Sequence, residues 1–160
     1  MRGAVAKSAS AAFRTSTLPS MTNPAGAAHD PVADELAVRN LIGRLSLNAD
    51  MGTVDEYLSS FATDALWNMP GNPSHGIDEI RAGLIARRES GAVGPGTNGR
   101  HMVSSIDVEM HGDRATARSY FQFVTNTNTT PVLALVGAYA DEFVRTEHGW
   151  KLHRRDITFG

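Results

Sequence analysis

Two residues at the boundaries of predicted elements have side chains suited to acid–base chemistry. His101 follows a glycine-rich segment at 91–99 and begins a predicted strand, whereas Asp50 ends the first predicted helix. A neutral imidazole accepts a proton near neutral pH, and a carboxylate bonded to its other ring nitrogen fixes the tautomer and stabilises the imidazolium. We therefore predict that Asp50 and His101 face one pocket. The alternatives are a structural or exposed histidine and, next to Gly52, an aspartate that only serves a turn.

Several other side chains are candidates for holding a substrate. Arg155 could stabilise a developing anion or a leaving group, although its basic surroundings at 151–155 are also typical of a solvated sheet edge. The candidates for lining the pocket or orienting the substrate are Asn48, Trp67, Tyr120 and Tyr139. The histidines lack metal-ligand spacing and the chain has no cysteine, so no metal is expected. The sequence also has no Rossmann or P-loop glycine pattern, and no cofactor is expected.

Length and composition indicate one globular domain. The chain has 160 residues, of which 41% are hydrophobic and 20% are charged, as is usual for such a domain. No apolar run approaches the roughly 20 residues needed to span a membrane. The net charge of −2 provides no basic surface for nucleic acid. Neither nucleic acid nor a membrane is therefore a predicted partner.

Residues 1–31 differ in composition from the rest of the chain. The first twenty residues are rich in Ala, Ser and Thr, with spaced basic residues and no acidic one, and residues 21–31 contain helix-breaking Pro and Gly. A mitochondrial transit peptide has this composition. The alternative, which we favour, is a disordered extension upstream of a start at Met21. We predict a disordered leader and linker over 1–31, a domain over 32–160, and a cytoplasmic location unless the leader directs the chain to mitochondria.

The first half of the domain is predicted to be mainly helical. Apolar residues recur at helical spacing from residue 32 to Asp50, after the start signal Asp30-Pro31. A second, short helix is capped by Thr53 with Glu56 three residues later and carries apolar residues as far as Phe61. A short strand over 65–69 precedes a third helix over 77–89. The glycine-rich segment that follows is a loop of the kind that often covers a site.

The second half of the domain is predicted to contain four strands, over 101–110, 114–125, 132–145 and 150–159. Apolar and polar residues alternate along them, and turn residues separate them. The third strand begins as an apolar run, which predicts that both of its faces are covered there. Helices followed by such a meander indicate an α+β fold, with helices packed on one face of a curved antiparallel sheet.

The order and spacing of these features resemble the SnoaL-like branch of the nuclear-transport-factor-2-like superfamily over roughly Val32 to Phe159. The matching motifs are Asn48-Ala49-Asp50, Ser60 to Ala65, Arg100-His101-Met102-Val103 and Gly149-Trp150-Lys151-Leu152. The resemblance implies a cone-shaped fold that encloses one deep pocket. In the similar enzymes scytalone dehydratase, bile-acid dehydratase and hexachlorocyclohexane dehydrochlorinase, an aspartate at the end of the first helix orients a histidine base. Asp50 and His101 match this pair, and Arg155 matches an arginine of the dehydrochlorinase.

The chain also departs from these enzymes. Ala49 replaces a tyrosine of scytalone dehydratase, no second histidine occurs between 114 and 125, and Leu45 replaces a lysine of the dehydrochlorinase. The base and its orienting carboxylate thus match, while the groups that activate the substrate differ. We expect a cofactor-independent, dehydratase-type lyase or isomerase that removes a proton from carbon in a hydrophobic small molecule, and we assign none of the three named reactions.

Three alternatives to this function stay open. The first is a non-catalytic ligand-binding or assembly module of the same fold, which a pocket filled by Trp67, Phe121 and Phe123 would favour. The second is the small subunit of a ring-hydroxylating dioxygenase, and the third is a polyketide cyclase or steroid isomerase. The apolar run over 132–139 would suit a buried interface. We therefore expect a homodimer or homotrimer, the trimer on the basis of the resemblance alone.

Overall fold

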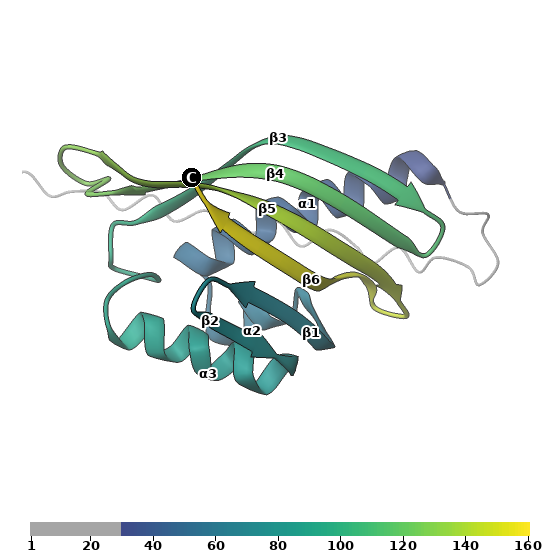
Figure 1. Ribbon diagram of the computed structural model, residues 1–160, viewed down its shortest axis with the longest axis horizontal. Coiled ribbons are helices and arrows are strands. Elements are labelled where there is room, and N and C mark those ends of the chain that lie inside the picture. The colour runs from purple at the N-terminus through teal and green to yellow at the C-terminus, as the bar shows by residue number, and fades with distance from the viewer. Residues whose placement is uncertain (1–29) are drawn as a thin grey trace, which may run out of the picture.

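Three helices lie on one side of a long, curved sheet (Figure 1). The computed structural model describes residues 30–160. Its elements are α1 (Pro31–Asp50), α2 (Val54–Leu58), β1 (Phe61–Met69), β2 (Asn72–His75), α3 (Gly76–Glu89), β3 (Arg100–His111), β4 (Arg114–Thr125), β5 (Val132–Thr146) and β6 (Gly149–Phe159). The predicted α+β class, with N-terminal helices and a curved sheet, is confirmed.

The sheet has six strands in the order β2-β1-β6-β5-β4-β3. One pair departs from the predicted antiparallel pattern, because β1 runs parallel to β6. The chain passes through β2, α3 and the β3–β5 meander before β6 returns beside β1. The sequence analysis also missed β2, which contains Pro73. This strand lies at the sheet edge, where proline is tolerated because no ladder hydrogen bond is required of it.

Local signals set the ends of the first two helices. The Asp30 side chain accepts a hydrogen bond from the Val32 backbone N–H at 3.0 Å, and Pro31 occupies the first helical turn. Thr53 and Glu56 form the predicted capping box at the start of α2. Phe61, which we expected at the end of that helix, instead begins β1. The chain turns after Leu58, and the backbone N–H of Leu152 in β6 donates to the carbonyl oxygen of Ser60.

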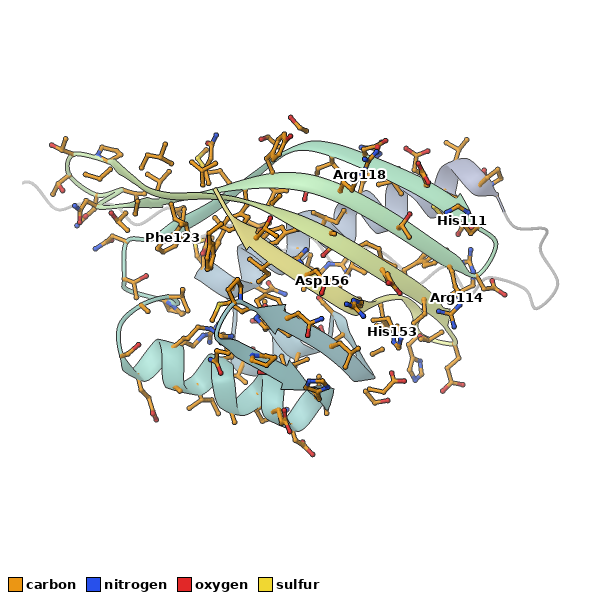
Figure 2. All side chains as sticks on the ribbon, in the orientation of Figure 1. His111, Arg114, Arg118, Phe123, His153 and Asp156 are labelled. Carbon is orange, nitrogen blue, oxygen red and sulfur yellow. The ribbon has the colours of Figure 1, made fainter. Side chains whose placement is uncertain are left out.

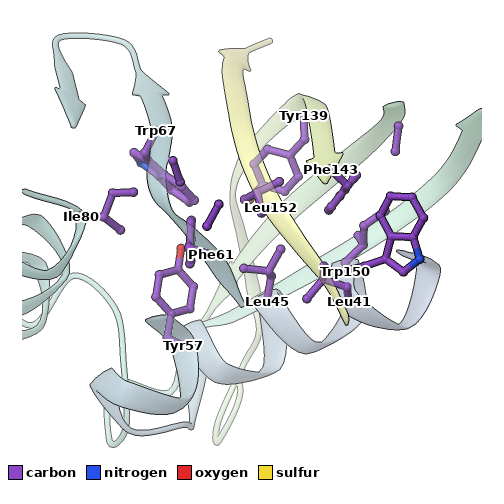
Figure 3. Packing of buried hydrophobic residues seen from close by; sticks show 14 of the residues in the cluster. Leu41, Leu45, Tyr57, Phe61, Trp67, Ile80, Tyr139, Phe143, Trp150 and Leu152 are labelled. Atoms are coloured by element: carbon purple, nitrogen blue, oxygen red, sulfur yellow. The ribbon is translucent and has the colours of Figure 1, made fainter. Parts of the chain in front are cut away.

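The core lies between the helices and the inner face of the sheet. One face of α1 is buried through Val38, Leu41, Ile42 and Leu45. Figure 3 shows Leu45 of α1 in the same group of buried side chains as Tyr57 of α2 and Phe61 of β1, whose ring centroids are 5.0 Å apart. On the neighbouring strands β4 and β5, the rings of Phe121 and Tyr139 stack with 4.3 Å between their centroids. This layer of helices and rings encloses the space in which the candidate site lies.

The apolar start of β5 is exposed within the single chain. Val132, Leu133 and Val136 are 48%, 56% and 41% exposed, so the prediction that both faces of this segment are covered does not hold for one copy of the chain. Of the leader and linker predicted over 1–31, residues 1–29 lie outside the described residues, while Asp30 caps α1 and Pro31 begins it. The cytoplasmic location stays a prediction. Between residues 30 and 160, we find no helix with the length and apolar character required to cross a membrane.

Candidate active site

Asp50 and His101 form a closely bonded pair at the wall of a cavity. One carboxylate oxygen of Asp50, Oδ1, lies 2.6 Å from ring atom Nδ1 of His101. The other oxygen, Oδ2, accepts a hydrogen bond from the His101 backbone N–H at 2.7 Å. An ionised carboxylate accepts hydrogen bonds but donates none, so Nδ1 is the donor of this bond, and in a neutral ring Nε2 then keeps its lone pair. Nε2 has no hydrogen-bond partner among residues 30–160.

The ends of two elements bring this pair together. Asp50 is the last residue of α1 and is 3% exposed. Just after the helix, the backbone at Gly52 comes very close to Asn48: a Cβ atom at Gly52 would lie 2.8 Å from Cα of Asn48. Glycine, which has no Cβ atom, fits at this turn. His101 lies opposite Phe123 in the β3–β4 ladder, and the centroids of their rings are 4.6 Å apart. The carboxylate and the aromatic ring thus hold the imidazole from two sides.

The imidazole lines a cavity of about 240 Å³ between the sheet and the helices. Figure 2 shows Phe123 pointing from β4 toward the side of the sheet that holds α3. Ala92 and Val93 contribute to the lining, so the loop after α3 borders the cavity, as loops near sites often do. Most of the lining is apolar, and it includes Leu45, Ala49, Trp67, Met69, Leu84, Phe121, Leu135, Ile157 and Phe159. The cavity is open, although Trp67, Phe121 and Phe123 all border it.

Arg155 borders the same cavity but is held in a buried ion pair. Its Nε and Nη2 atoms donate to the two carboxylate oxygens of Asp141 at 2.7 and 2.6 Å, and the two side chains are 3% and 1% exposed. Cζ of Arg155 also lies 3.8 Å from the centroid of the Tyr139 ring. Burial acts to lower the pKa of Arg155, but the Asp141 carboxylate outweighs it and raises this pKa. The charge of Arg155 is therefore matched by Asp141.

Two tyrosines supply neutral hydroxyl groups to the cavity. Burial raises the pKa of Tyr139 to about 12, despite the opposing effect of Arg155. Burial likewise raises the pKa of Tyr57 above its ordinary value. Both side chains line the cavity. At neutral pH each hydroxyl keeps its proton and can donate a hydrogen bond to an oxygen of a ligand.

The structure brings some of the sequence-predicted residues together and separates others. Trp67, Tyr139 and Arg155 line the cavity with His101. Asn48 is not part of the lining; its amide donates to the Glu56 carbonyl at 3.0 Å. Tyr120 is 59% exposed and borders a depression on the outer face of the sheet. Residues 30–160 contain no group of three or more His, Cys, Asp or Glu side chains that could hold a metal ion.

Sequence reasoning missed three residues of this region. Arg87 and Tyr57 line the cavity, and Asp141 is the partner of Arg155. Helical spacing contained a signal for Arg87, which lies three positions after the buried Leu84 and therefore on a neighbouring part of the same face. Asp141 faces Arg155 through the β5–β6 register, which a single sequence does not reveal.

Residues 30–156 match the SnoaL-like domain, so the chain belongs to this family. A protein of unknown function with a cystatin-like fold from Nostoc punctiforme is 25% identical, with a TM-score of 0.70, over 80% of this chain and 92% of that one. An NTF2-like protein from Novosphingobium aromaticivorans is 24% identical, with a TM-score of 0.70, over 80% and 82%. A protein from the same organism, provisionally named a scytalone dehydratase, is 20% identical, with a TM-score of 0.65, over 81% and 85%.

These likenesses support the fold and the family, not a particular reaction. No curated protein matches the chain significantly. The resemblance expected from the motifs is thus confirmed, since the family match extends over α1 and most of the sheet.

Proposed function

We propose that the chain is a small-molecule lyase or isomerase in which His101 removes a proton from a carbon atom of a hydrophobic substrate. The observation that carries this proposal is the bond between Asp50 and Nδ1 of His101, at 2.6 Å, beside the cavity. This bond leaves Nε2 without a hydrogen-bond partner among residues 30–160. Membership of the SnoaL-like family and the apolar lining support the same function.

The proposed step moves one proton and one electron pair. Nε2 takes the proton, and the electron pair of the broken C–H bond forms a new double bond in the substrate. In an elimination, a leaving group such as hydroxide departs with its bonding pair and takes the proton from the imidazolium, which returns His101 to its neutral form. In an isomerisation, the imidazolium returns the proton to another carbon. Asp50 stabilises the imidazolium in either case, and an apolar cavity strengthens this effect because little water competes.

Other side chains of the cavity are suited to assisting that step. The neutral hydroxyl of Tyr139 can donate to a substrate carbonyl or to a leaving hydroxyl group. Arg155, whose charge is matched by Asp141, packs against the Tyr139 ring and would orient this donor toward the substrate. The ring of Trp67 would pack against the apolar part of the substrate. In this proposal, Asp50 and His101 carry the proton chemistry, while Arg155, Trp67 and Tyr139 position the substrate.

Deuterium exchange provides a test that does not require the natural substrate. The full chain is incubated in D₂O with a panel of small cyclic ketones, β-hydroxy ketones and β,γ-unsaturated ketones, and NMR follows exchange, loss of water and double-bond migration. We expect turnover of at least one compound, and His101→Gln should lower its rate by about 10²- to 10⁴-fold, which is the usual contribution of a general base.

The control variant is Tyr120→Phe, because Tyr120 is exposed and lies outside the cavity lining. It should leave the rate unchanged. If compounds of the panel bind to the cavity but none exchanges or reacts, the proton-abstraction function is wrong and the ligand-binding module takes its place. The expected homodimer or homotrimer is a separate proposal, based on the exposed apolar residues of β5, and light scattering on the purified chain tests it.

A further inference from the structure

One positive charge at the cavity has no acidic partner within the described part of the chain, residues 30–160. Two guanidinium groups line it, those of Arg87 and Arg155, and the lining contains no Asp or Glu. Asp141 matches the charge of Arg155. The guanidinium of Arg87 has no ion pair and no hydrogen bond to any residue between 30 and 160. One of its nitrogens, Nη1, is buried without an acceptor.

Arg87 differs in this respect from the neighbouring arginines of α3. Arg81 donates to the Asp55 carboxylate at 2.7 Å, and Arg88 donates to the Asn48 carbonyl at 3.0 Å. Arg87 instead projects beside the ring of Trp67, with 5.9 Å between its Cζ atom and the ring centroid. The guanidinium thus lies beside an aromatic ring, which attracts a cation but provides no anionic oxygen.

Arg87 is half-buried, and a cation that is partly removed from water without a matching charge is stabilised when an anion binds beside it. Burial lowers the pKa of Arg87, yet a guanidinium stays protonated in proteins. Partly removing such a cation from water has a free-energy cost that a bonded anion offsets. The cavity is also small: its volume of about 240 Å³ lies below the roughly 300–1,000 Å³ of pockets for drug-sized ligands. One small, singly charged ligand would fill this space and match this charge.

We propose that Arg87 binds a carboxylate of the substrate, so that the substrate is a small apolar ring compound with one acidic group. This inference rests on the proposed function for the identification of the cavity as the substrate site. The ring lies among Phe121, Phe123 and Trp67, and the carboxylate faces α3. A neutral compound of the same shape leaves Arg87 unmatched and binds more weakly.

The test compares pairs of acids and amides that have the same shape. The probes are trans-cinnamate against trans-cinnamamide and benzoate against benzamide, with binding to the full chain measured by calorimetry or ligand-observed NMR. We expect at least one acid to bind about tenfold or more tightly than its amide, as is usual for a hydrogen bond to a charged group. Arg87→Met should abolish this preference by weakening the acid and leaving the amide unchanged.

Three further variants separate this role from structural effects. Arg87→Gln keeps polar donors without the charge and should also lose the preference, whereas Arg87→Lys should keep part of it. Arg81→Met removes an exposed charge from the same helix and should retain the full preference. Circular dichroism establishes that each variant is folded before binding is measured, and a folded Arg87→Gln suffices if Arg87→Met unfolds.

The outcomes are distinguishable from failure of the proposed function. The carboxylate subsite is overturned if neither acid binds, if acids and amides bind equally, or if the preference survives in folded Arg87→Gln. His101→Gln should keep the preference, because the imidazole is not the anion-binding group. An Arg87-dependent preference without any deuterium exchange or turnover would leave the subsite intact and refute the lyase or isomerase function alone.

Discussion

Asp50 contacts His101 at two points, through the ring nitrogen Nδ1 at 2.6 Å and through the backbone N–H at 2.7 Å. One carboxylate therefore fixes both the orientation of the imidazole and the start of the strand that carries it. The ring cannot turn about its side-chain bonds without losing the first contact. This coupling ties the end of α1 to β3 and makes Asp50 the residue on which the geometry of the base depends.

Replacing Asp50 by Asn should change the protonation pattern of the His101 ring. An amide can donate to Nδ1 as well as accept from it, so the preference for the Nδ1–H tautomer weakens. ¹⁵N NMR of the two ring nitrogens measures this change. Any deuterium exchange catalysed by the wild type should fall by about 10²- to 10⁴-fold. An unchanged Nδ1–H population in Asp50→Asn would contradict the role given to this carboxylate.

Replacing Asp141 by Asn should strongly destabilise the fold. The change leaves the buried guanidinium of Arg155 without a matching charge, which typically costs about 3–5 kcal/mol. Urea unfolding measures the loss in the free energy of unfolding. The matched control is Asp107→Asn, which breaks a 2.8 Å ion pair to Arg118 whose side chains are 57% and 77% exposed. Exposed pairs contribute little to stability because water and salt screen them, and equal losses in the two variants would refute the importance of burial here.

Two glycines should respond in opposite ways to substitution by alanine. A Cβ atom at Gly137 would lie 2.3 Å from the Thr158 carbonyl oxygen and 2.5 Å from the Phe121 ring. Gly137→Ala should therefore destabilise the chain by about 1–3 kcal/mol, as overpacking does, and displace a ring that lines the cavity. At Gly43, in α1, an added Cβ meets nothing within 4 Å.

Gly43→Ala should consequently stabilise the chain by about 0.5–1 kcal/mol, because alanine loses less backbone entropy in a helix. Thermal and urea unfolding of both variants provide the comparison. A stable Gly137→Ala variant that keeps the Phe121–Tyr139 stack would contradict the close approach described for this part of the sheet.

Tyr139 should make the fold sensitive to alkaline pH. Burial raises its pKa from 10.0 to about 12, so between these values the unfolded chain loses a proton that the folded chain keeps. The free energy of unfolding therefore falls as the pH rises from about 10 to 12, by on the order of 2 kcal/mol from this group. Urea unfolding at a series of pH values measures the slope. Tyr139→Phe should have a shallower slope, and an identical slope would refute this contribution.

The sequence by itself determined most of the elements and the residues that cap the first two helices. The Asp30 cap, the Thr53–Glu56 capping box and the alternation along β4 are local patterns, and the corresponding elements begin or lie where these patterns predict. Hydrogen bonds and periodicities of this kind act over a few residues, so they can be read without knowing the fold. The pairing of Asp50 with His101 came from their positions at element ends together with the family resemblance.

The tertiary structure alone decided which side chains share the cavity. Asn48 and Tyr120 were plausible candidates, but one bonds to Glu56 and the other lies on the outer face. The register between β3 and β4 shifts between Ser104 and Asp107, and each such shift changes the face that a strand residue occupies. Counting alternate residues therefore cannot assign the inner face of a curved sheet.

The charges of the cavity were equally a matter of tertiary structure. Whether an arginine is matched depends on carboxylates that approach from other elements, such as Asp141 across the β5–β6 register from Arg155. Arg87 and Arg155 look alike in the sequence, and only the fold leaves one of them without a carboxylate partner among residues 30–160. The physical reason is that Coulomb interactions depend on distance through space and on burial, neither of which is encoded in local sequence patterns.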